Sequence, residues 1–179
     1  MAGRAPRRVG GARYHGVAIA LHWSIAALVI LNLLSALLIP ALFPTHKAVG
    51  ITVLALSVLR WLWRLGHRMP PPPRDIPRWQ QLAARANHLA FYILLLALPL
   101  TGWVMVSATE RRRPLSWFGL FDIPYLPLAP SPAGARAHDA HVTLGLLMAA
   151  LVVLHVAAAL RHQFVLRDRL LGRMGVGSV

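Results

Sequence analysis

The chain has 179 residues, of which 57% are hydrophobic, and nineteen basic residues face only five acidic ones. Its mean hydropathy of +0.57 is too high for a water-soluble domain of this length. The net charge of +14 does not indicate a nucleic-acid partner, because the arginines flank apolar blocks instead of lining a polar helix face. Cysteine is absent, which excludes covalent c-type haem attachment, cysteine-ligated iron–sulfur clusters and dithiol redox chemistry.

Four apolar segments are long enough to cross a bilayer as helices, and the first of them contains no formal charge. The predicted spans are 17–43, 48–66, 86–109 and 140–160. Pro99 and Gly102 in the third span are tolerated in membrane helices. The sequence therefore predicts an all-α integral membrane protein, with a four-transmembrane-helix bundle that forms a single membrane domain over residues 1–179.

The two longer connections differ in character. MPPPPRDIPRWQ, residues 69–80, is a stiff proline-rich linker with no room for a separate domain. The connection 110–136 contains WFGLFDIPYLPLAPSP, which is rich in prolines and aromatic residues. Because aromatic side chains favour the membrane interface, we expect this loop to fold against the membrane surface.

The distribution of lysine and arginine predicts the orientation, since these residues favour the cytoplasmic side. Fourteen of them lie at the two termini and in the loop between the second and third spans, and five lie on the other side. The five are Lys47, Arg111, Arg112, Arg113 and Arg136. Both termini are therefore expected to be cytoplasmic.

His141 and His155 lie fourteen residues apart in the fourth span. At about 100° per residue they fall about 40° short of four full turns, so they share one helix face. A rise of about 1.5 Å per residue separates them by roughly 21 Å. An ionisable side chain at membrane depth is costly and usually functional, and imidazole is a common axial ligand of haem iron. The pair predicts two stacked haems, one near each membrane surface.

Depth in the membrane assigns a partner to each of these histidines. His22 lies as far from the cytoplasmic end of the first span as His155 lies from that of the fourth, so these two are expected to bind an inner haem. His46 opens the second span from the outside and His141 opens the fourth, so these two are expected to bind an outer haem. Each outer ligand is followed one turn deeper by a glycine, which offers a bare surface to a porphyrin: Gly50 and Gly145.

Two more histidines are alternative ligands. His88, at the cytoplasmic start of the third span, is the alternative to His22. His138 precedes His141 by three residues and lies on nearly the same helix face. The metal ligands predicted for the haem irons remain His22, His46, His141 and His155.

Five segments resemble the bacterial di-haem cytochrome b561 family: ALHW (20–23), HKAVGITVLALSVLRWLWRL (46–65), NHLAFYILLLALPLTGWVM (87–105), WFGLFDIP (117–124) and HVTLGLLMAALVVLHVAAALRHQF (141–164). In that family the first-span and late fourth-span histidines bind one b haem, and the second-span and early fourth-span histidines bind the other. These positions are His22, His155, His46 and His141 here. The resemblance implies electron transfer between the periplasmic face of the bacterial inner membrane and the quinone pool. Small stand-alone members oxidise superoxide and reduce ubiquinone.

Charged residues at the two surfaces suit these substrates. Superoxide is an anion, and the five outer cations would form a funnel that raises its encounter rate, unless they only contact lipid headgroups. Quinone reduction consumes protons, and His88, His162 and Arg13 lie on the cytoplasmic side as candidates for a quinone site. Arg60 is placed either to pair with a haem propionate or to reach the headgroups.

Two other functions fit the same sequence. The chain would serve equally as a cytochrome b anchor subunit, which passes electrons between a periplasmic dehydrogenase or hydrogenase and the quinone pool through the loop 110–136. Alternatively, it is a non-redox membrane scaffold in which the histidines are structural. A bound haem separates the first two functions from the third.

Overall fold

The computed structural model of the protein describes residues 14–67, 77–167 and 170–175. Arg13 and the larger part of the proline-rich linker lie outside these ranges. Four long helices make up most of the described chain: α1 (Gly16–Leu38), α2 (Phe43–Gly66), α3 (Arg78–Ser107) and α4 (Pro132–Leu160). All four are long and apolar enough to cross a membrane. The prediction of an all-α fold with four helices long and apolar enough to cross a membrane is confirmed.

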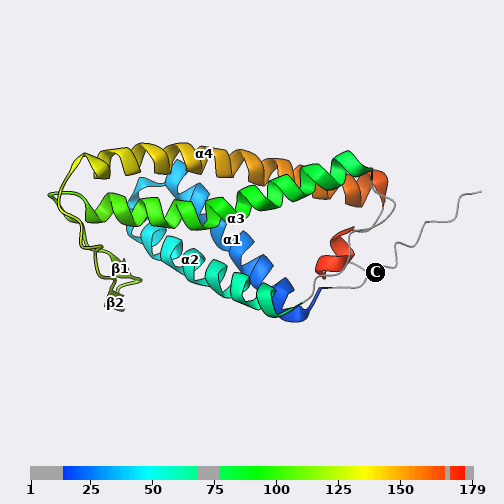
Figure 1. Ribbon diagram of the computed structural model, residues 1–179, viewed down its shortest axis with the longest axis horizontal. Coiled ribbons are helices and arrows are strands. Elements are labelled where there is room, and N and C mark those ends of the chain that lie inside the picture. Colours follow the sequence, from blue (N-terminus) through cyan, green and yellow to red (C-terminus); the bar gives the residue numbers. More distant parts are fainter. Residues whose placement is uncertain (1–13, 68–76, 168–169, 176–179) are drawn as a thin grey trace, which may run out of the picture.

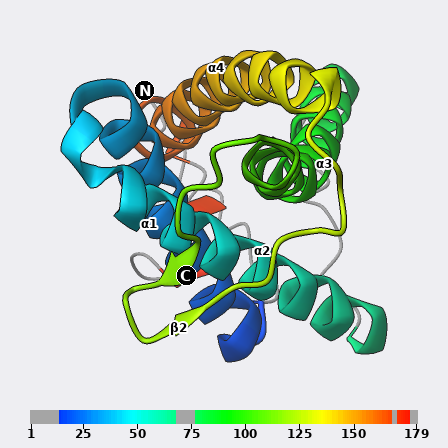
Figure 2. The same ribbon diagram turned by 90° about the vertical axis from the view of Figure 1, so that its left-hand side faces the viewer.

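The helices form two layers. α1 packs along α2, α3 packs along α4, and contacts between α2 and α3 join the two pairs. In the end-on view of Figure 2, α3 and α4 lie at the upper right, and α1 and α2 lie to the left of and below them. A side chain of α4 that meets one from α1 or α2 therefore does so across the interface of the layers.

Prolines set the turn between α1 and α2. Ile39 directly precedes Pro40, and a residue before proline is disfavoured in the helical conformation, so α1 ends there. A single 3-10 turn, η1 (Pro40–Leu42), follows, and α2 then begins with Pro44 in its first turn, where the missing N–H costs nothing. His46 therefore lies inside the first turn of α2. The hydropathy pattern predicts this turn between the spans 17–43 and 48–66, and the structure places it earlier, between Leu38 and Phe43.

α3 and α4 each begin eight residues before the predicted span, at positions 78 and 132 instead of 86 and 140. Hydropathy marks only the strongly apolar part of a helix, and the added turns contain charged, polar and small residues. The start of α4 approaches the end of α3 so closely that a Cβ at Gly134 would lie 2.7 Å from the carbonyl oxygen of Ala108. α4 continues beyond its last residue as a wider turn, η2 (Arg161–Leu166), which carries His162.

The loop after α3 contains a short antiparallel hairpin of β1 (Ser116–Trp117) and β2 (Phe121–Asp122). Its turn includes two residues with positive φ, Phe118 at 50° and Gly119 at 76°. Glycine adopts that conformation without strain. Figure 1 shows the hairpin at the end of the bundle opposite the start of α1.

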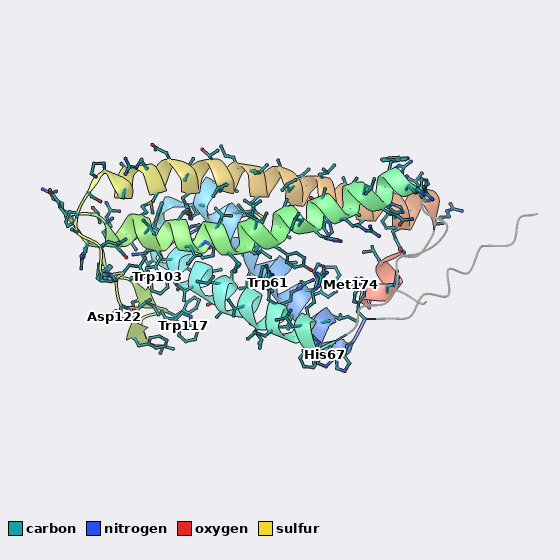
Figure 3. All side chains as sticks on the ribbon, in the orientation of Figure 1. Trp61, His67, Trp103, Trp117, Asp122 and Met174 are labelled. Atoms are coloured by element: carbon teal, nitrogen blue, oxygen red, sulfur yellow. The ribbon has the colours of Figure 1, made fainter. Side chains whose placement is uncertain are left out.

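The last described segment, η3 (Leu170–Met174), folds back onto the first helix. The indole N–H of Trp23 donates to the carbonyl oxygen of Met174 at 3.0 Å, and the backbone N–H of Tyr14 donates to that of Arg173 at 3.2 Å. The start of α1 and the last described segment thus lie at the same end of the bundle, where Figure 3 labels Met174 and His67.

Candidate functional site

His46 of α2 and His141 of α4 meet across the interface of the layers, with ring centroids 6.1 Å apart and ring planes at 80°. The Nδ1 of His46 lies 3.2 Å from the carbonyl oxygen of Asn32, and that of His141 lies 2.9 Å from the carbonyl oxygen of Leu98. A carbonyl can only accept, so both rings donate from Nδ1 and keep a free lone pair on Nε2. Histidines that bind metals typically show this arrangement, because the Nδ1 bond fixes the tautomer and the ring orientation.

The spacing of this outer pair fits one metal ion between the rings. An imidazole nitrogen binds a transition metal at about 2 Å. With about 1 Å more from nitrogen to ring centre, two axial imidazoles have centroids about 6 Å apart. The observed 6.1 Å agrees with this value.

α3 shapes the wall beside His141. The Thr101 hydroxyl donates to the carbonyl oxygen of Leu98 and lies 3.1 Å from Nδ1 of His141, so it shares the histidine proton. A Cβ at Gly102 would lie 3.2 Å from Cε1 of His141, closer than most real contacts. A side chain at position 102 would force the ring to shift, so glycine allows its present close contact with α3.

The two glycines expected to face a porphyrin are not crowded. A Cβ at Gly50 would have its nearest neighbour at 3.9 Å, the side-chain nitrogen of Asn32, and one at Gly145 would have it at 4.0 Å, a methyl group of Leu98. Protein packing alone therefore does not require glycine at either position. The bare, uncrowded backbone one turn deeper than each of the two histidines suits a flat macrocycle.

At the other end of the bundle, three histidines lie in the same region, although they do not gather into one metal-binding cluster. The rings of His155 and His88 lie 5.6 Å apart, and Phe91 meets His155 edge-on at 5.4 Å. His22 lies within electrostatic range of both histidines. The Asn87 side-chain nitrogen lies 3.3 Å from Nδ1 of His155.

Burial and layer position distinguish the predicted ligands from their alternatives. The four predicted ligands are half-buried, whereas His88 and His138 are exposed. His88 belongs to α3, in the same layer as α4, while His22 belongs to α1 across the interface of the layers. The Nδ1 of His138 lies 3.2 Å from the sulfur of Met105.

Arg60 lies inside the inner site. Its Nη1 donates to Nδ1 of His22 at 3.0 Å, so the proton of the neutral His22 ring is on Nε2. His22 can bind a metal through Nε2 only when its proton moves from Nε2 to Nδ1. Nδ1 can then no longer accept from Arg60, so the guanidinium must donate to another acceptor. A carboxylate is a stronger acceptor for a guanidinium than an imidazole is, so a haem propionate suits this arginine. The neighbouring Arg64 donates to the Tyr92 hydroxyl.

One face of α4 links the two levels. His141, Met148 and His155 follow one another at intervals of seven residues, about two helical turns, and Met148 is only 2% exposed. Among the described residues, no three His, Cys, Asp or Glu side chains gather into a metal site. Histidine pairs suit the two axial positions of a haem better than a tetrahedral metal site.

These features define a class: an integral membrane protein whose helix layers carry paired histidines suited to haem. The model of the prokaryotic cytochrome b561 family matches residues 13–177. The chain is 38% identical to cytochrome b561 homolog 2 of Escherichia coli (strain K12) over 135 residues, which are 72% of this chain and 68% of that protein. The chain therefore belongs to the prokaryotic cytochrome b561 family. It is a multi-pass membrane electron-transfer protein, and its family implies haem b cofactors.

Two further relatives agree. Cytochrome b561 homolog 1 of Escherichia coli (strain K12) is 32% identical over 134 residues, with 73% of this chain and 72% of that protein covered. The probable superoxide oxidase CybB of Yersinia pestis is 31% identical over 173 residues, with 90% of this chain and 95% of that protein covered. The family resemblance found in the sequence is confirmed.

Several residues around the histidines were not predicted from the sequence. The polar side chains of Asn32, Asn87 and Thr101 within apolar helices were an available signal, because such groups are costly in a membrane. Gly102 was recognised only as a residue that a membrane helix tolerates. The Leu98 carbonyl has no counterpart in the sequence pattern, since every residue has a carbonyl group.

Replacing Gly102 by alanine is expected to displace the His141 ring. Such crowding costs about 1–3 kcal/mol, so the outer site should hold haem more weakly while the inner site is unaffected. The haem-to-protein ratio and the reduced-minus-oxidised spectrum of the purified protein measure this effect. Gly66→Ala is the matched control, because a Cβ there meets nothing within 4 Å. An unchanged haem content in Gly102→Ala would show that His141 does not need this contact.

Proposed function

We propose that the chain moves electrons across the bacterial inner membrane, from superoxide at the periplasmic face to ubiquinone, by way of two b haems. The observation that carries this proposal is the His46–His141 pair, whose Nδ1 bonds leave both Nε2 lone pairs free and whose ring centroids lie at a spacing that fits one iron. The likeness to the probable superoxide oxidase CybB over 90% of the chain supports the substrate. Two superoxide anions, one ubiquinone and two protons would give two dioxygen molecules and one ubiquinol.

The proposed ligands are His46 and His141 for the outer haem and His22 and His155 for the inner one. Haem b, when bound, would supply a one-electron iron centre, and each iron would be held by one of these pairs of histidines. The helices hold the imidazoles at fixed depth and exclude water. Arg60 would hold a propionate of the inner haem, which would release His22 from its present bond to the guanidinium.

The outer surface would attract superoxide through its cations. The ammonium group of Lys47, next to His46 in the chain, donates to the carbonyl oxygen of Pro114 and lies within electrostatic range of Arg113. Arg112 instead has a structural role, because it donates to the carbonyl oxygen of Leu128 at 3.1 Å and stacks over Tyr125 at 5.0 Å. Arg111 and Arg113 are thus the arginines of this run to neutralise in a test.

The double variant Arg111→Gln/Arg113→Gln is expected to slow haem reduction by superoxide. Electrostatic steering raises association rates by roughly 10–10³-fold, so the loss of two cations should lower the rate about several-fold. The rate of the unaltered protein should also fall as salt rises, because ions screen beyond about 10 Å at 0.1 M. Stopped-flow absorbance measures both effects, and Arg78→Gln at the opposite end is the control. A rate that responds to neither change would exclude the funnel.

Ubiquinone would be reduced on the cytoplasmic side, where protons are available. His88 is exposed beside His155, and His162 lies in the wider turn η2 that follows α4. Wide turns of this kind are frequent at functional sites. These two histidines and Arg13, which lies outside the described residues, are the proposed quinone-site residues.

Both termini are proposed to be cytoplasmic. A cysteine introduced at position 5 or near the C-terminus should react with a membrane-impermeant maleimide only in inside-out vesicles, and one at Ser131 only in right-side-out vesicles. The chain has no cysteine of its own, so each label reports one position. Labelling of either terminus from the periplasmic side would invert the assignment of haems to substrates.

The substrate is tested with the purified holoprotein in liposomes that contain ubiquinone. A pulse of superoxide should reduce the haems and form one ubiquinol for every two superoxide anions consumed. Haems that stay oxidised after the pulse, yet become reduced when a periplasmic dehydrogenase or hydrogenase is added, would identify the chain as an anchor subunit instead.

A further inference from the structure

The β1–β2 hairpin turns apolar side chains outward. Phe118 is 50% exposed, Leu120 73% and Phe121 54%. The hairpin pairs its own backbone, and the Ser116 hydroxyl donates to the carbonyl oxygen of Phe121 at 3.2 Å. Its polar groups are thus largely satisfied internally, as an apolar environment requires.

The hairpin lies on the flank of the bundle and not above its end. β1 packs against α2, and the indole N–H of Trp117 donates to the Thr52 hydroxyl at 3.0 Å. Thr52 is nine residues beyond Phe43, where α2 begins, and so lies roughly 14 Å along the helix axis. Figures 1 and 2 agree that the hairpin lies beside α2, on the side away from α3 and α4, and Figure 3 labels Trp117 and Asp122 there.

We propose that this hairpin is an interfacial anchor, whose tip inserts between the headgroups and the acyl chains of the outer leaflet. Aromatic and aliphatic side chains favour this depth. The tip lies beside α2, on the flank of the bundle that would face lipid. A soluble partner that docks on the outer end of the bundle would approach along the helix axes and would meet the loop edge instead of this tip. The lipid bilayer is therefore the occupant that the placement favours.

Spin labelling in lipid nanodiscs tests the anchor. Leu120→Cys and Ser131→Cys each give a single nitroxide position in the holoprotein, and Ser131 is an exposed residue of the same loop. Collision rates with oxygen, which partitions into lipid, and with a water-soluble nickel chelate report the surroundings of each label. The oxygen-to-nickel ratio should be several-fold higher at position 120 than at position 131. A ratio at position 120 equal to or below that at position 131 would overturn the anchor and leave the tip to a soluble partner.

A second inference concerns Asn87 and rests on the proposed function. The side-chain oxygen of Asn87 is buried and has no hydrogen-bond partner among the described residues, while its nitrogen faces Nδ1 of His155 at 3.3 Å. In this arrangement the amide donates, and the proton of the neutral His155 ring is on Nε2. That tautomer is opposite to the one held by His46 and His141.

Rotation of the Asn87 side-chain amide, which exchanges its oxygen and its nitrogen, would remove this difference in tautomer. The oxygen would then accept the Nδ1 proton of His155, and the Nε2 lone pair would become free. We infer that Asn87 is the positioning residue of His155 and holds it in the metal-binding tautomer. His46 and His141 are held in this tautomer by backbone carbonyl oxygens. A substitution of Asn87 should therefore change the midpoint potential of the inner haem and not that of the outer one.

Two substitutions of similar size should shift the midpoint potential of the inner haem in opposite directions. Asn87→Asp strengthens the acceptor, makes the imidazole more electron-donating and should lower the midpoint potential of the inner haem. Asn87→Leu removes the acceptor and should raise it. Spectroelectrochemical titration measures both, with the outer haem as internal reference. Shifts of the same sign, or none, would overturn this role, whereas an unaltered protein without haem would overturn the proposed function itself.

Discussion

Replacing His141 by alanine is expected to lower the haem content from two to one per chain, with only the outer haem lost. The proposed outer site has one histidine from each helix layer, and His46 would be left as the single imidazole to hold the haem. His155 lies fourteen residues away on the same helix, roughly 21 Å along the axis, so the inner site is untouched. Haem quantitation and low-temperature difference spectra of the purified variant measure the loss.

His138→Ala is the matched control for this variant. His138 lies three residues before His141 on the same helix, but it is exposed and its ring contacts the sulfur of Met105. It should therefore retain both haems with unchanged spectra. Loss of both haems from a folded His141→Ala protein would refute the assignment to two independent levels. Loss of haem from His138→Ala would make that residue the ligand.

Replacing His22 by alanine is expected to remove the inner haem, whereas replacing His88 should leave both haems in place and slow ubiquinone reduction. Both histidines lie close to His155, but His22 faces it from the other layer and His88 from the neighbouring helix of the same layer. A porphyrin held between the layers would lie within reach of His22. Haem content separates the two variants, and ubiquinol formation gives the second readout.

The opposite pattern is equally informative. If His88→Ala loses the inner haem and His22→Ala keeps it, then the inner haem lies against α3 and α4, and Arg60 keeps its bond to His22 permanently. His15→Ala is the control, because His15 precedes α1 and is exposed. That variant should retain both haems.

The helices and the two histidine levels followed from the sequence because both are periodic. Apolar runs gave the four spans, and a fourteen-residue interval on one face gave the two depths. The meeting of His46 with His141 agrees with the depth argument. The helix starts at 78 and 132 could not be predicted from hydropathy, because their first turns contain charged, polar and small residues.

The surroundings of the ligands were harder to predict, since they depend on how helices pack. The bond from His141 to the Leu98 carbonyl joins residues 43 positions apart. The need for glycine at position 102 arises only from the ring that rests against it. His22 and His88 likewise have similar depths in the sequence pattern, and only helix packing separates them, because it places them in different layers and leaves His88 exposed.

Haem quantitation on the unaltered protein tests the central claim most directly. The pyridine haemochrome spectrum, with protein measured by amino-acid analysis, should give two b haems per chain. One haem per chain would contradict the two-level arrangement of His22, His46, His141 and His155, and a colourless protein would contradict haem binding altogether.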